Sequence, residues 1–313
     1  MLLDNKLEQL LINVSNKAAL SSFYLVGKKD KNLADKAAVD AMRIELNKID
    51  MKGEIVIGEG ELDEAPMLYI GEKLGSMNGP ELDIAVDPLE GTNFAANNLP
   101  GALSVIAIAN KNDLFKAPET YMNKISANVS ETGVVDLDYS VKKNISNLSE
   151  YKNKKPEDLT ACILDRPRHK NIINELGKLG VNLKLITDGD VSGALLVSDE
   201  KYGVDLFLGI GGGPEGVLAA SALDAFNCKF QGRFLFEKEK DKQRALMMGV
   251  KDLNKKYNLK DIVSGDSIFC ATGVTSGDLV SGIKLNNDEF ISETLITHKS
   301  SGLKRIIKTV QKI

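Results

Sequence analysis

Apolar residues recur at helical spacing at the start of the chain. Those that would share one helix face are Leu3, Leu7, Leu10, Leu11, Val14 and Ala18. This pattern predicts a helix of about 20 residues. The polar residues 28–32 interrupt the spacing, and residues 34–49 resume it as a second predicted helix. A shorter helix is predicted over 66–74, because Pro66 lies near its start and Gly75 follows its end.

Short apolar runs predict strands in the first half of the chain. They cover residues 55–57, 82–86 and 103–109. Residues 134–151 combine a strand signal with a helical signal that follows it. The mixture of the two periods indicates an α/β protein.

The second half alternates strands and helices. Strands are predicted at 160–164, 183–186 and 204–210, helices at 170–179 and 217–226, and mostly β structure from Ile268 onward. Each of the three strands leads directly into a loop, and open α/β sheets bind ligands at the carboxyl ends of their strands. The polar stretch 152–158 contains Pro156 and is the predicted domain boundary. The expected domains are therefore residues 1–157 and 158–313.

The most informative segment is 82–93, which reads LDIAVDPLEGTN. Its apolar start predicts a strand that ends in a turn from Asp87 to Thr92. Such a turn presents two carboxylates, a backbone carbonyl and a hydroxyl, which are oxygen ligands that hard divalent cations prefer. Gly91 lets the backbone approach a ligand, and the N–H groups of Gly91 and Thr92 could bind a phosphate. The local chemistry suggests a metal-assisted phosphate site.

Composition excludes several other classes of protein. With 43% hydrophobic and 27% charged residues, the chain is expected to be globular. A net charge of −4 without a long basic run argues against a nucleic-acid partner. The sequence has no apolar stretch of membrane-spanning length and no signal-peptide pattern. Three widely spaced cysteines, Cys162, Cys228 and Cys270, are interpreted as buried thiols, which predicts a cytoplasmic protein.

Taken singly, the candidate acids have simpler explanations. Asp35 and Glu215 could be acids at helix starts, where the helix dipole favours negative charge. Thr92 could be a helix N-cap. Glu59 lies between two glycines, and Asp87 ends an apolar strand, where a carboxylate needs a partner. Four acids that each follow a loop or a strand end could instead converge on one metal cluster.

Basic groups in the second half suggest a separate anion site. Arg166 and Arg168 follow a predicted strand, with Pro167 stiffening the backbone between them. Arginine pairs bidentately with phosphate, although surface arginines are common. His169 is interpreted as a structural residue or a minor phosphate contact rather than a general base.

Two further loops contain candidate binding groups. Asp188 and Asp190 flank Gly189, which is typical of a tight turn and also suits contacts to sugar hydroxyls. Residues 211–213 are three glycines that could cradle a phosphate. They are not a P-loop, because no Gly-Lys-Ser/Thr follows them.

The DPLEGT segment at 87–92 resembles the Asp-Pro-x-Asp-Gly-Thr signature of the lithium-sensitive phosphatases, which include inositol monophosphatases and fructose-1,6-bisphosphatases. Glu90 replaces the second aspartate of that signature. Six further motifs follow the same family order: KNLAD at 31–35, GEGELDEAP at 58–66, APETYM at 117–122, RPRH at 166–169, DGD at 188–190 and GGGPEG at 211–216. Together they are similar to class II fructose-1,6-bisphosphatase, the bacterial type. The resemblance implies a five-layer α/β/α/β/α sandwich.

The resemblance also implies roles for individual residues. Its metal ligands, for Mg²⁺ or Mn²⁺, map onto Asp35, Glu59, Asp87 and Glu215. Its catalytic residues map onto Thr92, which would orient the attacking water, and onto Asp87, Glu90 and Lys31. Its substrate contacts map onto Glu90, Gly91, Thr92, Tyr121, Arg166, Pro167, Arg168, Asp188, Gly189, Asp190 and Gly212. The resemblance makes the first expected domain the metal-binding domain with the catalytic DPLEGT motif and the second the substrate-binding domain, to which Glu215 also belongs.

The expected activity is hydrolysis of the 1-phosphate of fructose 1,6-bisphosphate to fructose 6-phosphate and phosphate, a step of gluconeogenesis. One alternative is a bifunctional fructose and sedoheptulose bisphosphatase, and another is an inositol-phosphate phosphatase. A monophosphate substrate would not need both Arg166 and Arg168. A non-catalytic sugar-phosphate sensor is disfavoured, because it would not need Thr92 and the full set of acids. We expect a homo-oligomer, either a dimer or a tetramer.

Overall fold

The chain folds into two compact units. The computed structural model describes residues 3–58 and 67–312. Unit 1 consists of Met1–Lys116 together with Val263–Ile313, and unit 2 is the continuous segment Ala117–Ile262.

This division differs from the boundary expected at residue 157, which falls inside unit 2. The strand β5 (Tyr121–Ala127) pairs with β8 (Leu206–Gly212) and β9 (Lys229–Leu235), so residues before 157 belong with the second half. The strand β11 (Ser267–Gly273) pairs with β4 (Leu103–Asn110), which returns the end of the chain to unit 1. The polar stretch 152–158 is thus a surface segment within unit 2. The division into units follows instead from the pairing of strands that lie far apart in the sequence.

Unit 1 is built on an eight-stranded sheet. In spatial order its strands are β12 (Lys284–Asn286), β13 (Glu289–His298), β11, β4, β3 (Glu81–Glu90), β1 (Lys52–Ile57) and β2 (Lys73–Leu74), and β14 (Leu303–Lys312) pairs with the other side of β13. β1 and β3 are parallel, and the remaining neighbours are antiparallel. The short helix α3 (Thr92–Ala96) follows β3 directly.

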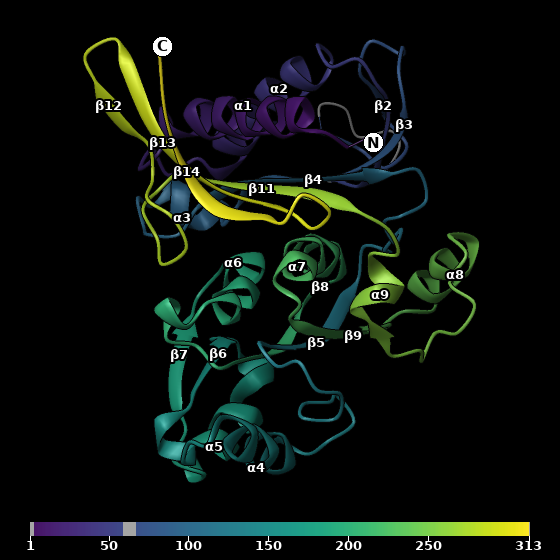
Figure 1. Ribbon diagram of the computed structural model, residues 1–313, viewed down its shortest axis with the longest axis vertical. Coiled ribbons are helices and arrows are strands. Elements are labelled where there is room, and N and C mark those ends of the chain that lie inside the picture. Colours follow the sequence, from purple (N-terminus) through teal and green to yellow (C-terminus); the bar gives the residue numbers. More distant parts are fainter. Residues whose placement is uncertain (1–2, 59–66, 313) are drawn as a thin grey trace. The chain divides into compact units, whose positions relative to one another are not determined.

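Two long helices cover one face of this sheet (Figure 1). They are α1 (Asn5–Phe23) and α2 (Lys31–Leu46), and the carboxylates of Asp4 and Asp30 cap them by accepting bonds of 2.9 Å from backbone N–H groups. The expected first helix is confirmed. The second begins three residues earlier than expected, because Asp30 supplies an N-cap that the apolar spacing did not reveal.

Unit 2 is built on a six-stranded sheet. Its order is β10 (Tyr257–Asn258), β9, β5, β8, β6 (Thr160–Leu164) and β7 (Asn182–Ile186). β8, β6 and β7 are parallel, so their carboxyl ends lie on one edge of the sheet. The strands expected at 160–164 and 183–186 are confirmed.

Helices cover both faces of the unit 2 sheet (Figure 1). On one face α4 (Val141–Lys152) and α5 (Lys170–Lys178) pack over an apolar cluster that includes Ile125 and Ile163. On the other lie α6 (Asp190–Leu195) and α7 (Gly213–Phe226), where Ser126 of β5 donates to a carbonyl of α6. The remaining helices are α8 (Glu239–Met247), α9 (Leu259–Ile262) and the 3₁₀ turns η1 (Pro156–Asp158), η2 (Pro167–His169), η3 (Leu196–Ser198) and η4 (Glu200–Tyr202). Unit 1 thus has two layers and unit 2 has three, which confirms the α/β sandwich class.

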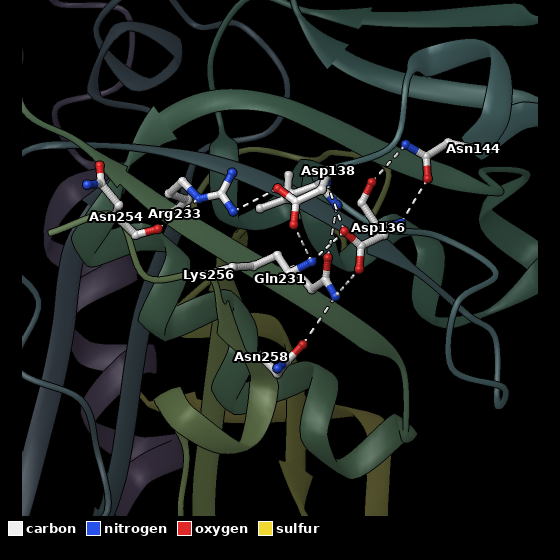
Figure 2. Close-up of polar contacts among 9 residues, drawn as sticks. Asp136, Asp138, Asn144, Gln231, Arg233, Asn254, Lys256 and Asn258 are labelled. Carbon is white, nitrogen blue, oxygen red and sulfur yellow. Dashed lines mark hydrogen bonds and ion pairs between the residues drawn. The ribbon is translucent and has the colours of Figure 1, made fainter. Parts of the chain in front are cut away.

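A polar network holds residues 134–140 of unit 2, where a strand signal was expected (Figure 2). The backbone N–H and carbonyl of Asp136 both bind the Asn144 side chain, at 2.8 and 3.0 Å. Lys256 pairs with the carboxylates of Asp136 and Asp138, at 2.5 and 2.6 Å. Because side chains satisfy its polar groups, this apolar run forms a loop instead of a strand.

Two other expectations change. Residues 67–74 of the helix expected at 66–74 are not helical, because Gly71 has a φ of +94°, and β2 takes up the end of this stretch. β3 extends to Glu90, through most of the expected turn. No helix in the described part of the chain is long and apolar enough to cross a membrane.

Candidate active site

The DPLEGT segment lies at the junction of β3 and α3 in unit 1. Its pairing to β4 shifts register between Asp87 and Glu90, which is a bulge that redirects the strand end. Gly91 has a φ of +76° and is the N-cap of α3. Only glycine adopts this backbone conformation without strain, so the chain turns sharply after Glu90.

Thr92 is the first helical residue of α3, and α3 has no side-chain capping bond. The N-cap explanation for Thr92 is therefore wrong. Asp87 and Thr92 are half-buried, whereas Glu90 is 4% exposed. The strand end thus presents a carboxylate and a hydroxyl that solvent still reaches.

The start of α2 is bound to α3. The chain between α1 and α2 donates backbone bonds of 2.9 Å from Gly27 and Lys29 to carbonyls of α3. Lys31 is exposed at the first position of α2, and Asp35 is half-buried in its second turn. The predicted residues Lys31 and Asp35 thus come from a helix that contacts the element carrying Thr92.

Glu59 lies outside the described residues. Ile57, the last residue of β1, pairs in parallel with Ala85 of β3. β1 therefore ends at the same edge of the sheet at which β3 presents Asp87, as expected for two parallel strands.

In unit 2 the predicted binding residues collect at the carboxyl edge of β6, β7 and β8. Arg166 and Arg168 follow β6, Asp188 and Asp190 follow β7, and Gly212 ends β8. Tyr121 joins this edge from β5, where it pairs with Gly212. The structure brings these residues together within the unit, as the rule for open sheets predicts.

Arg168 is anchored at this edge. Its Nε and Nη2 donate to the Ile210 carbonyl at 3.0 and 2.7 Å, and its guanidinium lies 4.9 Å from the centroid of the Tyr121 ring. Arg168 and Tyr121 remain exposed. A guanidinium held in this way keeps further N–H groups available for an anion.

His169 ties β6 to β8. Its Nδ1 lies 2.7 Å from the Leu164 carbonyl, and its Nε2 accepts from the Ile210 N–H at 2.7 Å. The ring is fully buried, and this burial lowers its pKa. Both nitrogens bind backbone groups, so the structural interpretation of His169 is confirmed.

The glycines at the end of β8 make room for carboxylates. A Cβ at Gly211 would lie 1.9 Å from Oδ2 of Asp190, and one at Gly212 would lie 1.8 Å from Oε2 of Glu215. The strand end is therefore bare backbone flanked by two acids, which explains the glycines without a P-loop.

Sequence reasoning missed Lys124. This lysine of β5 is 1% exposed, and it pairs with Asp190 and donates to the Gly212 carbonyl at 2.6 Å. The available signal was a charged residue in the stretch 122–127, MNKISA, in which polar and apolar residues are mixed. A buried charged residue needs a buried partner. The spacing of apolar and polar residues does not show which residue that partner is.

Glu215 lies in the first turn of α7. Loss of solvent around its carboxylate raises its pKa, the Lys124 charge opposes this effect, and Asp190 adds to it. A nearby cation would stabilise this desolvated carboxylate. Within unit 1, the carboxylates of Asp35, Asp87 and Glu90 are oxygen donors of the kind that hard divalent metals prefer. Within residues 3–58 and 67–312, no three His, Cys, Asp or Glu side chains form a metal-binding group by themselves.

A layered α/β fold with an acidic strand end in unit 1, and with two arginines after β6 in unit 2, is the combination expected of an α/β phosphatase. More specifically, the chain belongs to the glpX-encoded bacterial fructose-1,6-bisphosphatase family, whose model matches residues 5–311. It is thus a phosphoric monoester hydrolase of the fructose-bisphosphatase type, and the expected family is confirmed.

Similar proteins of this type occur in cyanobacteria. A protein of Prochlorococcus marinus (strain MIT 9301) is 39% identical over 322 residues, which cover 98% of this chain and 97% of that protein. A protein of Synechococcus sp. (strain JA-3-3Ab) is 39% identical over 333 residues, which cover 98% and 96%. Both are named D-fructose 1,6-bisphosphatase class 2/sedoheptulose 1,7-bisphosphatase.

Proposed function

We propose that this enzyme hydrolyses the 1-phosphate of fructose 1,6-bisphosphate in a reaction that requires Mg²⁺ or Mn²⁺. The observation that carries the proposal is the DPLEGT segment at the β3–α3 junction, in a chain whose family match spans residues 5–311. This segment supplies a carboxylate, a hydroxyl and the first N–H groups of a helix within six consecutive residues.

The proposed metal ligands are Asp35, Glu59, Asp87 and Glu215, with the Leu89 carbonyl as a further oxygen donor. When bound, the metal would lower the pKa of a water and neutralise charge on the phosphoryl oxygens. Loss of any one carboxylate should therefore weaken both metal binding and turnover.

In unit 1 the proposed catalytic work falls to groups at the start of α2 and α3. The Thr92 hydroxyl would accept a hydrogen bond from the attacking water and orient it, with the Glu90 carboxylate beside it in the chain. The N–H groups of Gly91 and Thr92 would hold the reacting phosphate. The Lys31 ammonium would balance its charge.

In unit 2 the proposed work is substrate binding. Arg166 and Arg168 would bind the phosphate that does not react, with Pro167 and Tyr121 beside them. Asp188 and Asp190 would bind sugar hydroxyls around the turn at Gly189, next to Gly212. Binding energy from this remote end can position the reacting end.

A second candidate substrate is sedoheptulose 1,7-bisphosphate, because both cyanobacterial relatives are named for it as well. The test is phosphate release from fructose 1,6-bisphosphate, sedoheptulose 1,7-bisphosphate, fructose 6-phosphate and inositol 1-phosphate, each with Mg²⁺ and with Mn²⁺. Preference for one or both bisphosphates supports the proposal. Equal or greater activity on inositol 1-phosphate would contradict it.

We also propose a cytoplasmic homo-oligomer, a dimer or a tetramer. The three cysteines are buried, which suits a reducing compartment, since they need no oxidising environment for stability. Light scattering of the purified enzyme tests the oligomer, and a monomer at micromolar concentration would contradict it.

A further inference from the structure

Lys124 is a charged residue in the interior of unit 2. Its side chain is among the largest that are fully buried, and it crosses the first turn of α7 to reach the end of β8. A Cβ at Gly216 of α7 would lie 2.8 Å from Sδ of Met122 and 3.3 Å from Cδ of Lys124, so the lysine stem packs closely against the start of α7. The ammonium therefore arrives at the edge where the predicted substrate residues lie.

The ammonium makes two bonds there. One goes to Oδ2 of Asp190, and the other goes to the Gly212 carbonyl at 2.6 Å. A buried ammonium needs such partners, because an unpaired charge is costly in the interior. The same two bonds fix a carboxylate and a peptide group at the carboxyl end of β8.

Asp190 has a second oxygen that is not used. The residue is 8% exposed, and among the described residues no group donates to its Oδ1. Gly211 provides the space that this carboxylate occupies, since a Cβ there would lie 1.9 Å from Oδ2 and 2.8 Å from Oδ1. A buried acceptor without a donor is destabilising unless a ligand supplies one.

A structural ion pair of the same unit provides the contrast. Lys152 pairs with Oδ1 of Asp205 at 2.8 Å, and Oδ2 of Asp205 accepts from the Thr160 N–H at 3.0 Å. Both oxygens of Asp205 are thus bound within the protein. Asp190 differs, because one of its oxygens still lacks a donor.

We propose that Lys124 is a positioning residue for the sugar bisphosphate, an inference that rests on the proposed function. Lys124 holds Oδ2 of Asp190 and the Gly212 carbonyl, and thereby keeps Oδ1 of Asp190 in place to accept a bond from a sugar hydroxyl. Lys124 thus contributes to substrate binding, whereas other residues bind the reacting phosphate.

The experiment compares Lys124→Met, Asp190→Asn and the double variant. Steady-state kinetics give kcat and KM for fructose 1,6-bisphosphate, calorimetry gives its binding constant, and thermal unfolding gives Tm. Lys124→Met should raise KM by about 10- to 100-fold and change kcat much less, because a charge-assisted bond is worth about 1.5–3 kcal/mol. The double variant should resemble the worse single variant, because each change removes the same contact.

Lys152→Met is the control, since it also removes a lysine partner from a buried aspartate of unit 2, and Lys154 still pairs with Asp205 at 3.0 Å. It should lower Tm while leaving KM within about 2-fold. Gly211→Ala is a second variant that moves the Asp190 carboxylate and keeps Lys124, and it should raise KM as well. If Lys124→Met does not fold, the KM of Gly211→Ala tests whether the position of the Asp190 carboxylate matters for substrate binding.

An unchanged KM in folded Lys124→Met, or in Gly211→Ala if the former does not fold, would overturn the proposal. The proposal would also be overturned if the increases in KM caused by Lys124→Met and by Asp190→Asn multiplied in the double variant. If the wild-type enzyme binds fructose 1,6-bisphosphate without hydrolysing it, only the proposed function fails. The binding constants of the same variants then still decide the role of Lys124.

Discussion

At the scale of single residues, the backbone of Gly91 determines what Thr92 can do. Since Gly91 is the N-cap, the Thr92 hydroxyl is not needed to cap α3. Asp87 lies on the other side of this turn, beyond the bulge in β3. Substitution of either side chain should therefore affect turnover directly.

Asp87→Asn should reduce phosphate release at least about 100-fold while the protein stays folded, because the amide replaces a proposed metal-binding oxygen. Phosphate release at several metal concentrations, with circular dichroism for folding, measures this. Glu81→Gln in the same strand is the control and should behave as wild type, since Glu81 is exposed at its far end. Near-normal activity of Asp87→Asn would refute the assignment.

Thr92→Ala should lower kcat about 100-fold or more with little change in KM, if the hydroxyl orients the water. Thr92→Ser keeps the hydroxyl and should retain most activity. Steady-state kinetics on fructose 1,6-bisphosphate separate the two parameters. A rise in KM alone would make Thr92 a binding residue.

Arg168→Ala should raise KM for fructose 1,6-bisphosphate about 10- to 100-fold, because a charge-assisted contact to the distal phosphate is worth about 1.5–3 kcal/mol. The KM for a sugar monophosphate should change far less. The comparison of kcat/KM for both substrates in both proteins is the measurement. An equal loss for the two substrates would reject the distal-phosphate role and favour an inositol-phosphatase activity.

At the scale of elements, one imidazole joins the ends of β6 and β8 beyond their backbone pairing. His169 joins the end of β6 to Ile210 of β8, and Arg168 binds the carbonyl of that same residue. The hydrogen bonds require a neutral ring, because Nε2 must accept the Ile210 N–H. The geometry of the proposed anion site is therefore linked to the protonation of a buried histidine.

This linkage predicts how stability depends on pH. The pKa of His169 is lowered from 6.5 in the folded state, so its contribution is present above that pH and is lost as pH falls through the folded pKa. His169→Phe should cost about 2–5 kcal/mol, since two buried backbone groups lose their partner. Urea unfolding at about pH 8 and about pH 5.5 measures both effects. If the variant lost as much stability on acidification as wild type, His169 would not be the responsible group.

Local signals predicted the elements well where one period dominated. The helix α1 and the strand β6 follow from apolar spacing, because each buries a continuous face. The strand β7 was located from its apolar residues, although none of them is fully buried. The prediction of a helix at 66–74 was wrong for the described residues 67–74. The left-handed backbone of Gly71 and the pairing of β2 with β1 outweighed the helical signals of Pro66 and Gly75. The candidate residues of unit 2 could be located from the strand ends, whereas Lys124 could not, since its role depends on a partner 66 residues away.

At the scale of the whole molecule, the two units differ in continuity. Unit 2 is one segment with its own apolar cluster, whereas unit 1 combines both ends of the chain. In unit 1, β11 lies between β4 and β13, so the sheet is incomplete without residues beyond 263. The expected boundary could not reveal this arrangement, because pairing between distant strands leaves no local mark.

The segment 117–262 should therefore fold by itself, whereas 1–116 should not, since β4 would be left as an exposed edge. Thermal unfolding followed by circular dichroism should show a cooperative transition for the former and none for the latter. A cooperative transition for 1–116 would contradict the need for β11.

The discontinuity of unit 1 also has a consequence during synthesis on the ribosome. Domains generally fold in the order in which they emerge. Here unit 2 is complete before β11 and β13 have been synthesised. Until then, residues 1–116 can form only the part of the unit 1 sheet that contains β1 to β4. At a rate of roughly 5–20 residues per second, that interval lasts on the order of ten seconds. During this interval β4 is an unpaired strand edge, which favours aggregation, and a chaperone would be most useful then.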